Sequence, residues 1–352
     1  MSRYMNLRAR GAELAFLSLA LVLSGCATSG KPVADVPPTP EAAVVAPPPS
    51  AVPWWRETGD PVLATLIQQG LDTNPEIACR IASLRQYDHQ VEQDAKQIGA
   101  RLGRLFGDRS VRADPAARDI KVDRVSSRRE RLAHQIALAY VDVRRLQQDV
   151  ALRGALRDQY KDNAEVAQFR REAGLVSAID GSLARTQDET ARGELGFAQG
   201  RLDQAMAELG RLVGEKPADL AAKLGSPGAI PDPSANELSA TPSDDPRRAV
   251  LADAVLREAR LTQALEESRR TVRDARTAYR EGAGAFSTLY VAEAASLAVE
   301  LALVDARASR VTTTLDLWSG QDSAWAREGL APVVAPDPTA NGPTITVTAA
   351  CD

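Results

Sequence analysis

The sequence predicts an all-α protein built from long antiparallel helical hairpins in two quasi-repeats. Three observations lead to this fold class. Aromatic residues make up only 4% of the chain and charged residues 26%. Such a chain buries narrow alanine and leucine seams between long helices more easily than a wide aromatic core. Apolar residues also recur every three or four positions, and a unit of helix, glycine turn and returning helix occurs twice.

The N-terminus has the pattern of a bacterial export signal. A basic start with Arg3, Arg8 and Arg10 precedes an apolar run over residues 14–23, which match the n-region and h-region of such signals. The run is about half as long as the roughly 20 residues that a helix needs to cross a bilayer. Residues 1–25 are therefore predicted to be a signal peptide that is removed, not a membrane span.

Leu23, Ser24, Gly25 and Cys26 resemble the lipobox of bacterial lipoproteins. In that motif the cysteine sulfur receives a diacylglycerol, a transfer that suits the nucleophilic thiolate. The resemblance implies a covalent diacylglycerol and N-acyl lipid on Cys26 and no other cofactor. It also implies an outer-membrane location facing the periplasm, because the next residue is Ala27 and not aspartate. The alternative is an ordinary signal peptide that happens to contain a cysteine.

Residues 26–53 are rich in proline, alanine and valine and lack helical periodicity. They are predicted to form a semi-rigid tether. Of the two remaining cysteines, Cys79 falls within a predicted helix and Cys351 in the C-terminal tail. An oxidising periplasm permits a disulfide between them, but nothing in their spacing requires one.

The first helical repeat is expected over residues 54–214. Trp54 and Trp55 open it, either as a membrane-interface anchor or by packing on the helical body. A short helix follows, and Asn74 with Pro75 marks a break before a second helix that reaches about Gly99. The residues that form the apolar face of the short helix are Leu63, Leu66, Ile67 and Leu71.

Glycines and a proline interrupt the pattern over residues 99–126, and no alternating strand pattern replaces it. One continuous helix is then predicted from about Ser126 to Ala173, roughly 70 Å long. Such a length is typical of coiled coils. Its apolar positions are Leu132, Ile136, Tyr140, Val143, Leu146, Val150, Leu156, Tyr160 and Ala164.

Gly174 ends this helix, and a returning helix is predicted from about Ser177 to Val213. Six prolines follow within residues 215–246, which predicts a linker without helix. The returning helix continues the heptad seam. Its seam residues are Ile179, Leu183, Leu195, Ala198, Leu202, Ala205, Leu209 and Leu212.

A second, truncated repeat is expected over residues 247–325, with a third long helix, a glycine-rich turn and a fourth helix over 286–318. The seam of the third helix contains Leu261, Leu265, Ser268, Val272, Ala275 and Tyr279. Gly174 and Gly282 are 108 residues apart, as are Ala184 and Ala292. The tail over 326–352 loses periodicity and is predicted to be disordered.

Several motifs occur in one order after the lipobox. They are Trp54-Trp55, Asp60-Pro61, Leu63, Leu66, Asn74-Pro75-Glu76, Ala139-Tyr140-Val141-Asp142 and the twofold turn at Gly174 and Gly282. Over about residues 54–325 the chain resembles the TolC-type outer-membrane efflux proteins, specifically the acylated NodT/OprM-like branch. The resemblance implies a homotrimer with a helical periplasmic tunnel, a periplasmic adaptor (membrane fusion protein) and an inner-membrane pump as partners.

The resemblance also implies that Gly174, Asp180 and Gly282 lie at the tunnel tip, where the adaptor docks. Asp180 follows a predicted helix start and is expected to be a capping or first-turn charge. If it lines the tip, it could instead help to gate cations.

The chain departs from the family where β-hairpins are expected. Each membrane strand needs about 9 to 11 residues of alternating pattern. No such segment is visible over 99–126, and residues 245–261 leave no room for one. The sequence therefore predicts a shortened relative with a TolC-like periplasmic α-domain and little or no β-barrel.

Other function classes find little support. His89 and His134 lie on helical patterns far from any cysteine at metal-ligand spacing, so no metal site and no enzyme are predicted. The net charge of −4 gives no reason to expect nucleic-acid binding. The leading hypothesis is an outer-membrane-factor-like lipoprotein of a tripartite efflux or export system. The alternative is a non-conducting periplasmic helical scaffold or accessory lipoprotein.

Overall fold

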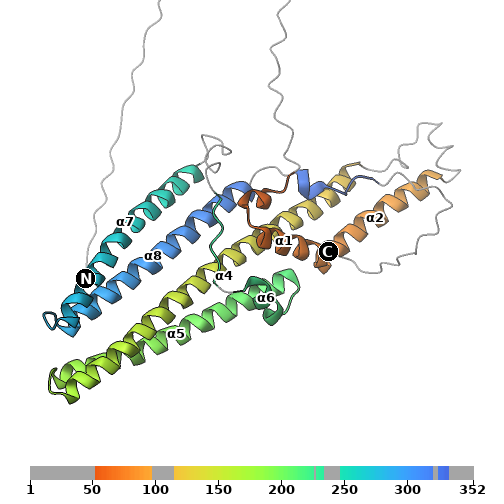
Figure 1. The fold of residues 1–352 in the computed structure, drawn as a ribbon. Helices are drawn as coiled ribbons and strands as arrows, with labels where there is room; N and C mark the ends of the chain where they lie inside the picture. The colour runs from red at the N-terminus through yellow and green to blue at the C-terminus, as the bar shows by residue number, and fades with distance from the viewer. Residues whose placement is uncertain (1–51, 97–114, 226, 234–245, 320–323, 333–352) are drawn as a thin grey trace, which may run out of the picture. The chain divides into compact units, whose positions relative to one another are not determined.

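The computed structural model describes residues 52–96, 115–225, 227–233, 246–319 and 324–332 (Figure 1). This part of the chain contains α-helices and short 3-10 helices but no strand. Its elements are η1 (Trp54–Thr58), α1 (Pro61–Thr73), α2 (Pro75–Lys96), α4 (Pro115–Glu172), α5 (Ala178–Val213), α6 (Pro217–Leu224), α7 (Arg247–Arg280), α8 (Phe286–Ser319) and η2 (Ala324–Arg327).

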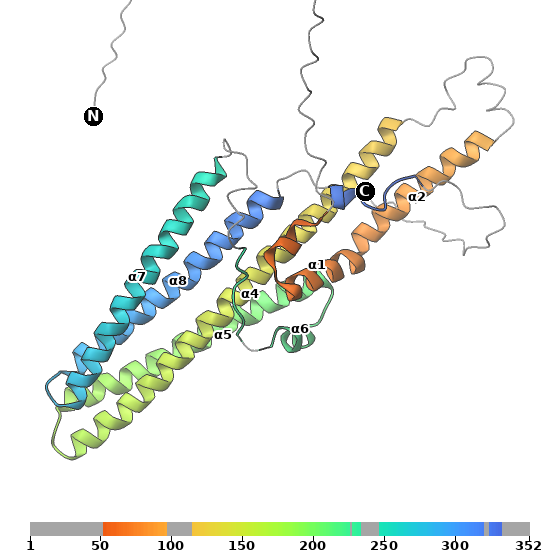
Figure 2. The ribbon, with the colours of Figure 1, turned by 45° about the horizontal axis from the view of Figure 1, so that its top comes forward.

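Within these residues the predicted all-α class with two long helical hairpins is confirmed. Helices α4 and α5 form the first hairpin, α7 and α8 form the second, and α8 packs along α4 (Figures 1 and 2). The predicted signal peptide, the lipobox around Cys26 and the tether up to residue 51 lie outside the described residues.

Helix α4 carries the predicted apolar seam. Leu132, Ile136, Tyr140, Val143 and Leu146 are all buried. Most of them join residues of α1, α5 and α8 in one core cluster. The three-and-four spacing therefore identified the buried face of the longest helix correctly.

The start of α4 was predicted wrongly. The helix begins at Pro115 and not near Ser126, because α2 stabilises the polar stretch. Val122 and Val125 are buried in a cluster with Leu84 of α2. Nε of Arg118 also lies 2.7 Å from a carboxylate oxygen of Asp88 on α2.

The linker over 215–246 was also predicted wrongly, because it contains α6. Pro217 stands at the start of this helix, where its missing N–H costs nothing. Leu220 and Leu224 are buried in the main core cluster. The short helix is therefore held by tertiary burial of two leucines that lie one turn apart.

The internal repeat is confirmed in the structure. Helices α5 and α8 begin at Ala178 and Phe286, which are 108 residues apart. The buried face of α8 repeats that of α5 at the same offset. Buried pairs at this offset include Ala184 with Ala292, Ala198 with Ala306, Met206 with Thr314, and Leu209 with Leu317.

The two tryptophans at the start of the fold pack into the core. Trp54 and Trp55 are buried, and the rings of Trp55 and Trp325 meet edge to face with centroids 4.5 Å apart. Of the two readings of these tryptophans, packing on the helical body is the one observed. The motif residue Asp60 begins α1, where its Oδ1 accepts hydrogen bonds from the N–H groups of Val62 and Leu63.

The disordered tail was predicted over residues 326–352, and its predicted start is too early in the chain. Ala326 and Leu330 are buried, and Nη2 of Arg85 donates to the carbonyl oxygen of Gly329 over 2.6 Å. This segment lacks helical periodicity, and contacts with helices far away in the chain hold it in place. Residues 333–352 lie outside the described part.

Two further features of the helices bear on the predictions. Cys79 on α2 is disulfide-bonded, and its partner lies outside the described residues. Helix α8 is long and apolar enough to cross a membrane by length and composition alone. In the structure it packs against α4 and α7.

Candidate functional site at the hairpin turns

Both hairpins turn at a glycine in the left-handed conformation. The φ angles are 72° at Gly174 and 77° at Gly282, values that strain any residue with a Cβ atom. The turns also share their hydrogen bonding. Leu175 N–H donates to the carbonyl of Arg170 over 2.8 Å, and Ala283 N–H donates to that of Ala278 over 2.9 Å.

The two turns lie at the same end of the hairpins (Figures 1 and 2). The guanidinium of Arg170 on α4 lies 4.9 Å from the ring centroid of Tyr279 on α7. Its Nη1 also donates to the Tyr279 carbonyl over 3.4 Å. One arginine thus joins the last turn of α4 to the last turn of α7.

Asp180 lies in the first turn of α5, beside the first glycine turn. Ser177 caps this helix, because its Oγ accepts a hydrogen bond from the Asp180 N–H over 3.2 Å. The same hydroxyl donates to Oδ2 of Asp180 over 3.0 Å. The carboxylate therefore stabilises the helix start, as the capping interpretation expected, and the negative charge suits the N-terminal end of the helix dipole.

A buried carboxylate links the two hairpins. Oε1 of Glu293 on α8 lies 2.9 Å from Nη2 of Arg276 on α7. Its Oε2 accepts a hydrogen bond from Nδ2 of Asn163 on α4 over 3.1 Å. Nη2 of Arg276 also donates to Oε1 of Gln159 on α4 over 2.5 Å. Three helices from two hairpins therefore share one polar network.

Burial decides the electrostatics of this network. It raises the pKa of Glu293, while Arg276 and Asn163 act in the opposite direction. Burial also raises the pKa of Tyr160 on α4. The ring of Tyr160 lies against that of Tyr290 on α8, with centroids 5.7 Å apart. The hairpins thus meet through a polar network and an aromatic contact. Both lie in a region that is partly shielded from water.

The sequence reasoning found the glycines and Asp180 but missed Glu293, Arg276 and Asn163 as a unit. One signal was available. Glu293 is a charged residue within a largely apolar segment of α8, one turn after Leu289. A charge in such a place needs a partner, but the sequence did not show that the partners come from α7 and α4.

The turn of the first hairpin exposes large apolar side chains. Phe169 is 71% exposed and Ile179 is 76% exposed, and Val166 and Leu175 are exposed beside them. The prediction that Ile179 belongs to the buried seam is therefore wrong, because the seam of α5 starts after its first turn. Contiguous exposed apolar surface is typical of interaction sites.

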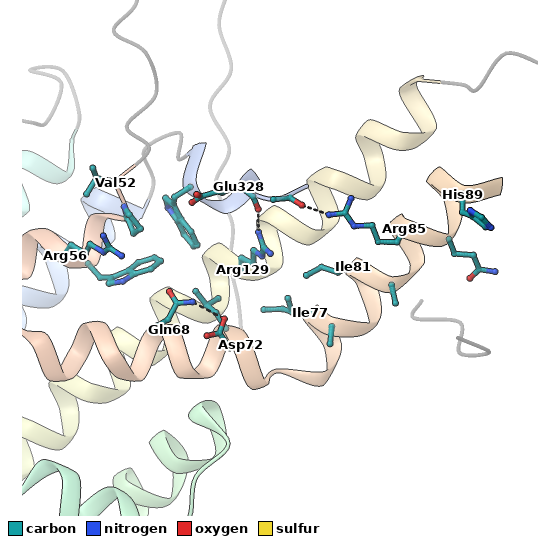
Figure 3. Close-up of a pocket in the computed structure, with 18 residues that line it drawn as sticks. Val52, Arg56, Gln68, Asp72, Ile77, Ile81, Arg85, His89, Arg129 and Glu328 are labelled. Carbon is teal, nitrogen blue, oxygen red and sulfur yellow. Dashed lines mark hydrogen bonds between the residues drawn. The ribbon is translucent and has the colours of Figure 1, made fainter. Parts of the chain in front are cut away.

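A groove of about 1360 Å³ lies among η1, α1, α2, α4 and η2 (Figure 3). Ile77 and Ile81 of α2 supply apolar wall. Arg129 on α4 donates to the carbonyl oxygen of Glu328 over 2.9 Å, as Arg85 does to Gly329. Both arginines thus hold the segment after η2 in place.

The described residues contain no group of three or more His, Cys, Asp or Glu side chains that could hold a metal ion. Nε2 of His134 pairs with Oδ1 of Asp316 on α8 over 2.7 Å. Nε2 of His89 lies 2.9 Å from Nε2 of Gln93. These histidines therefore make helix-to-helix and same-helix contacts.

No protein-family profile and no curated protein matches the sequence. Solved structures do match the fold. The outer-membrane channel OprN is 15% identical with a TM-score of 0.63, over 78% of this chain and 92% of that chain. The CmeC outer membrane channel of Campylobacter jejuni is 10% identical with a TM-score of 0.61, over 78% and 89%. The outer membrane protein VceC of Vibrio cholerae is 16% identical with a TM-score of 0.57, over 77% and 97%.

These solved structures are of channel or outer-membrane proteins and not of enzymes. At such low identity the likeness concerns the arrangement of helices. This chain therefore has the fold of the TolC-type outer-membrane channels.

Proposed function

We propose that this protein is an outer-membrane-factor-like lipoprotein component of a tripartite efflux or export system. Copies of the chain, three by the family resemblance, would surround a helical periplasmic tunnel. The fold likeness to OprN, CmeC and VceC supports the channel role. The lipobox supports acylation of Cys26 and attachment to outer-membrane lipid.

The observation that carries this proposal is the pairing of two left-handed glycine turns at one end of two linked hairpins. Gly174 and Gly282 would lie at the periplasmic tip, with Asp180 holding the start of α5 rigid. The exposed apolar residues around Phe169 give a periplasmic adaptor a surface to bury. The inner-membrane pump would reach the tunnel through that adaptor.

Opening would separate the hairpins at this end. The Arg170 contact with Tyr279 and the Glu293 network hold α4 against α7 and α8. A small apolar cluster with Ala167, Tyr279 and Phe286 also joins the hairpins at this end. A docked partner that binds the separated arrangement more tightly would shift the population toward it.

The proposal is tested by extracting the native protein in mild detergent and measuring its oligomeric mass and single-channel conductance. We expect a multi-copy particle that conducts. Arg276→Ala and Arg170→Ala together should increase the open fraction. The control, Arg211→Ala, removes an exposed ion pair with Glu208 elsewhere on α5 and should leave conductance unchanged. A monomer without conductance would overturn the channel role.

The anchor is tested separately with Cys26→Ala. We expect loss of membrane retention and a smaller mass of the mature N-terminal peptide. Retention of the variant in the outer membrane would contradict the view that the acyl chains provide the principal hold on the bilayer.

A second candidate function is a non-conducting periplasmic scaffold or accessory lipoprotein. One observation favours it: the part of the chain that the structure describes contains no strand. A particle of several copies that binds the adaptor but passes no current would support this function over the channel.

A further inference from the structure

The groove of Figure 3 is bordered by a cysteine that is already bonded. Cys79 of α2 is disulfide-bonded and half-buried. It precedes the groove-lining residues Ala82 and Gln86 by three and seven positions, so all three share one side of the helix. Any segment that is bonded to Cys79 is therefore held at the edge of the groove.

The sequence contains two other cysteines that could be the partner, Cys26 and Cys351. A sulfur that carries a diacylglycerol has no thiol left for a disulfide. The proposed acylation of Cys26 therefore leaves Cys351 as the partner of Cys79, and this choice rests on the proposed function. The path of the chain and the sequence before Cys351 support the same pairing without it.

The described chain leaves the helical body close to Cys79. Nη1 of Arg85 donates to the carbonyl oxygen of Ala331 over 3.1 Å. Arg85 and Cys79 are six residues apart on α2, which is about 9 Å along a helix axis. Nineteen residue steps lead from Pro332 to Cys351, and an extended chain of that length covers up to about 60 Å. The chain is thus long enough to return to Cys79.

The sequence before Cys351 has the pattern of an extended segment. Over residues 344–348 threonine alternates with isoleucine and valine. Successive side chains of an extended chain point to opposite sides, so Ile345, Val347 and Ala349 would share a side with Cys351. The side that carries the sulfur is therefore the apolar side, as burial against a groove wall requires.

The groove offers such a segment an apolar wall and an excess of positive charge. Ile77 and Ile81 of α2 and Leu71 of α1 line it. Residues 333–352 contain two aspartates and no lysine or arginine, so opposite charges favour the contact. The charged residues of the lining are three arginines and two carboxylates: Arg56, Arg85, Arg129, Asp72 and Glu328 (Figure 3).

We propose that residues 344–351 lie extended along this groove, with Ile345 and Val347 against its apolar wall, and that a disulfide between Cys79 and Cys351 ties them there. Formation of the bond is an oxidation in which each cysteine thiol loses a proton and an electron. The oxidant is a protein disulfide of the periplasm, which takes up the two electrons and two protons by thiol–disulfide exchange and becomes a dithiol. The bonded segment then shields the groove from water.

The pairing is tested on the full-length protein in native membranes. Free thiols are blocked with N-ethylmaleimide, and the protein is digested with trypsin without reductant. Mass spectrometry should find peptide 57–80 joined to the peptide that begins at residue 328 and contains Cys351. On a non-reducing denaturing gel the chain should migrate as a single copy. A maleimide adduct on Cys79, or a covalent dimer that reductant dissociates, would overturn the pairing.

The position of the segment is tested with a photoreactive residue. Irradiation of Val347→benzoylphenylalanine should attach the segment to residues that line the groove. The matched control, Thr346→benzoylphenylalanine, places the same group on the opposite side of the segment and should give a several-fold lower yield. Adding Cys351→Ser to the Val347 variant should also lower the yield several-fold. Equal yields from Val347 and Thr346 would overturn the placement in the groove.

The outcomes separate this inference from the proposed function. Cys26→Ala removes the acylation site and should retain the linked peptides. A disulfide between Cys79 and Cys26 in the wild type would overturn both the acylation and this inference. An acylated Cys26 together with a maleimide adduct on Cys79 would overturn this inference alone, and the conductance of the native particle would still decide the channel role.

Discussion

Arg276 on α7 and Glu293 on α8 lie 2.9 Å apart, and the glutamate side chain is only 2% exposed. Asn163 on α4 binds the second oxygen of the same carboxylate. A single buried charge therefore joins the two hairpins near their turns. A buried carboxylate is unfavourable unless its charged and hydrogen-bonding partners remain. Removal of one partner of Glu293 should therefore lower the stability of the fold.

Removing the cation should destabilise the fold. Arg276→Ala leaves Glu293 buried without its charged partner, and we expect a loss of about 1.5–3 kcal/mol in unfolding free energy. Urea denaturation measures this. The control Arg211→Ala removes a solvated ion pair and should leave the midpoint unchanged. Equal effects of the two substitutions would mean that the Glu293 network contributes no more to the unfolding free energy than the solvated ion pair does.

The stability of the protein should depend on pH through Glu293. Burial raises the pKa of this group in the folded state, so the folded protein binds the proton more tightly than the unfolded chain. Its contribution to stability is then full below the unfolded pKa and is lost as the pH rises through the folded pKa.

The measurement compares the wild type with Glu293→Gln at several pH values. Lowering the pH from about 7 to about 5 should increase the stability of the wild type relative to the variant, since the unfolded glutamate pKa is about 4.3. Other titrating groups cancel in this difference. A difference that stays constant with pH would show that the carboxylate keeps its ordinary pKa.

The turn glycines should resist substitution for conformational reasons alone. No other atom lies within 4 Å of a Cβ built on Gly174 or Gly282. Gly174→Ala and Gly282→Ala should therefore each cost about 1 kcal/mol from the left-handed backbone, and their effects should add. Gly154→Ala, in open space within α4, should instead stabilise by up to about 1 kcal/mol. Thermal unfolding distinguishes the opposite signs.

Tyr140 should be coupled to Asp60. Its hydroxyl donates to Oδ2 of Asp60 over 2.7 Å and accepts a hydrogen bond from Nε of Arg144 over 3.0 Å. We expect Tyr140→Phe to cost about 1–3 kcal/mol, because a buried arginine loses an acceptor. Asp60→Ser retains a helix cap but not the reach to Tyr140. A double-mutant cycle that gave no coupling energy would contradict this link.

The sequence by itself determined what depends on neighbouring residues. The apolar seams followed from helical spacing. Helix α5 begins after Ser177 and ends at Gly214, as predicted. A helix cap requires only a nearby side chain or a left-handed glycine, so both ends follow from the local sequence. The 108-residue repeat was visible in the sequence because both turns use a glycine at the same position. Both turns also form the same local hydrogen bonds.

Only the tertiary structure decided what depends on distant partners. The early start of α4 depends on Leu84 and Asp88 of α2. The burial of Leu330 depends on helices far away in the chain. The sequence motifs around Asp60 and Tyr140 were visible separately, but their hydrogen bond spans 80 residues. Local pattern sets how a segment folds, whereas the partner of a buried polar group is set by which helices meet.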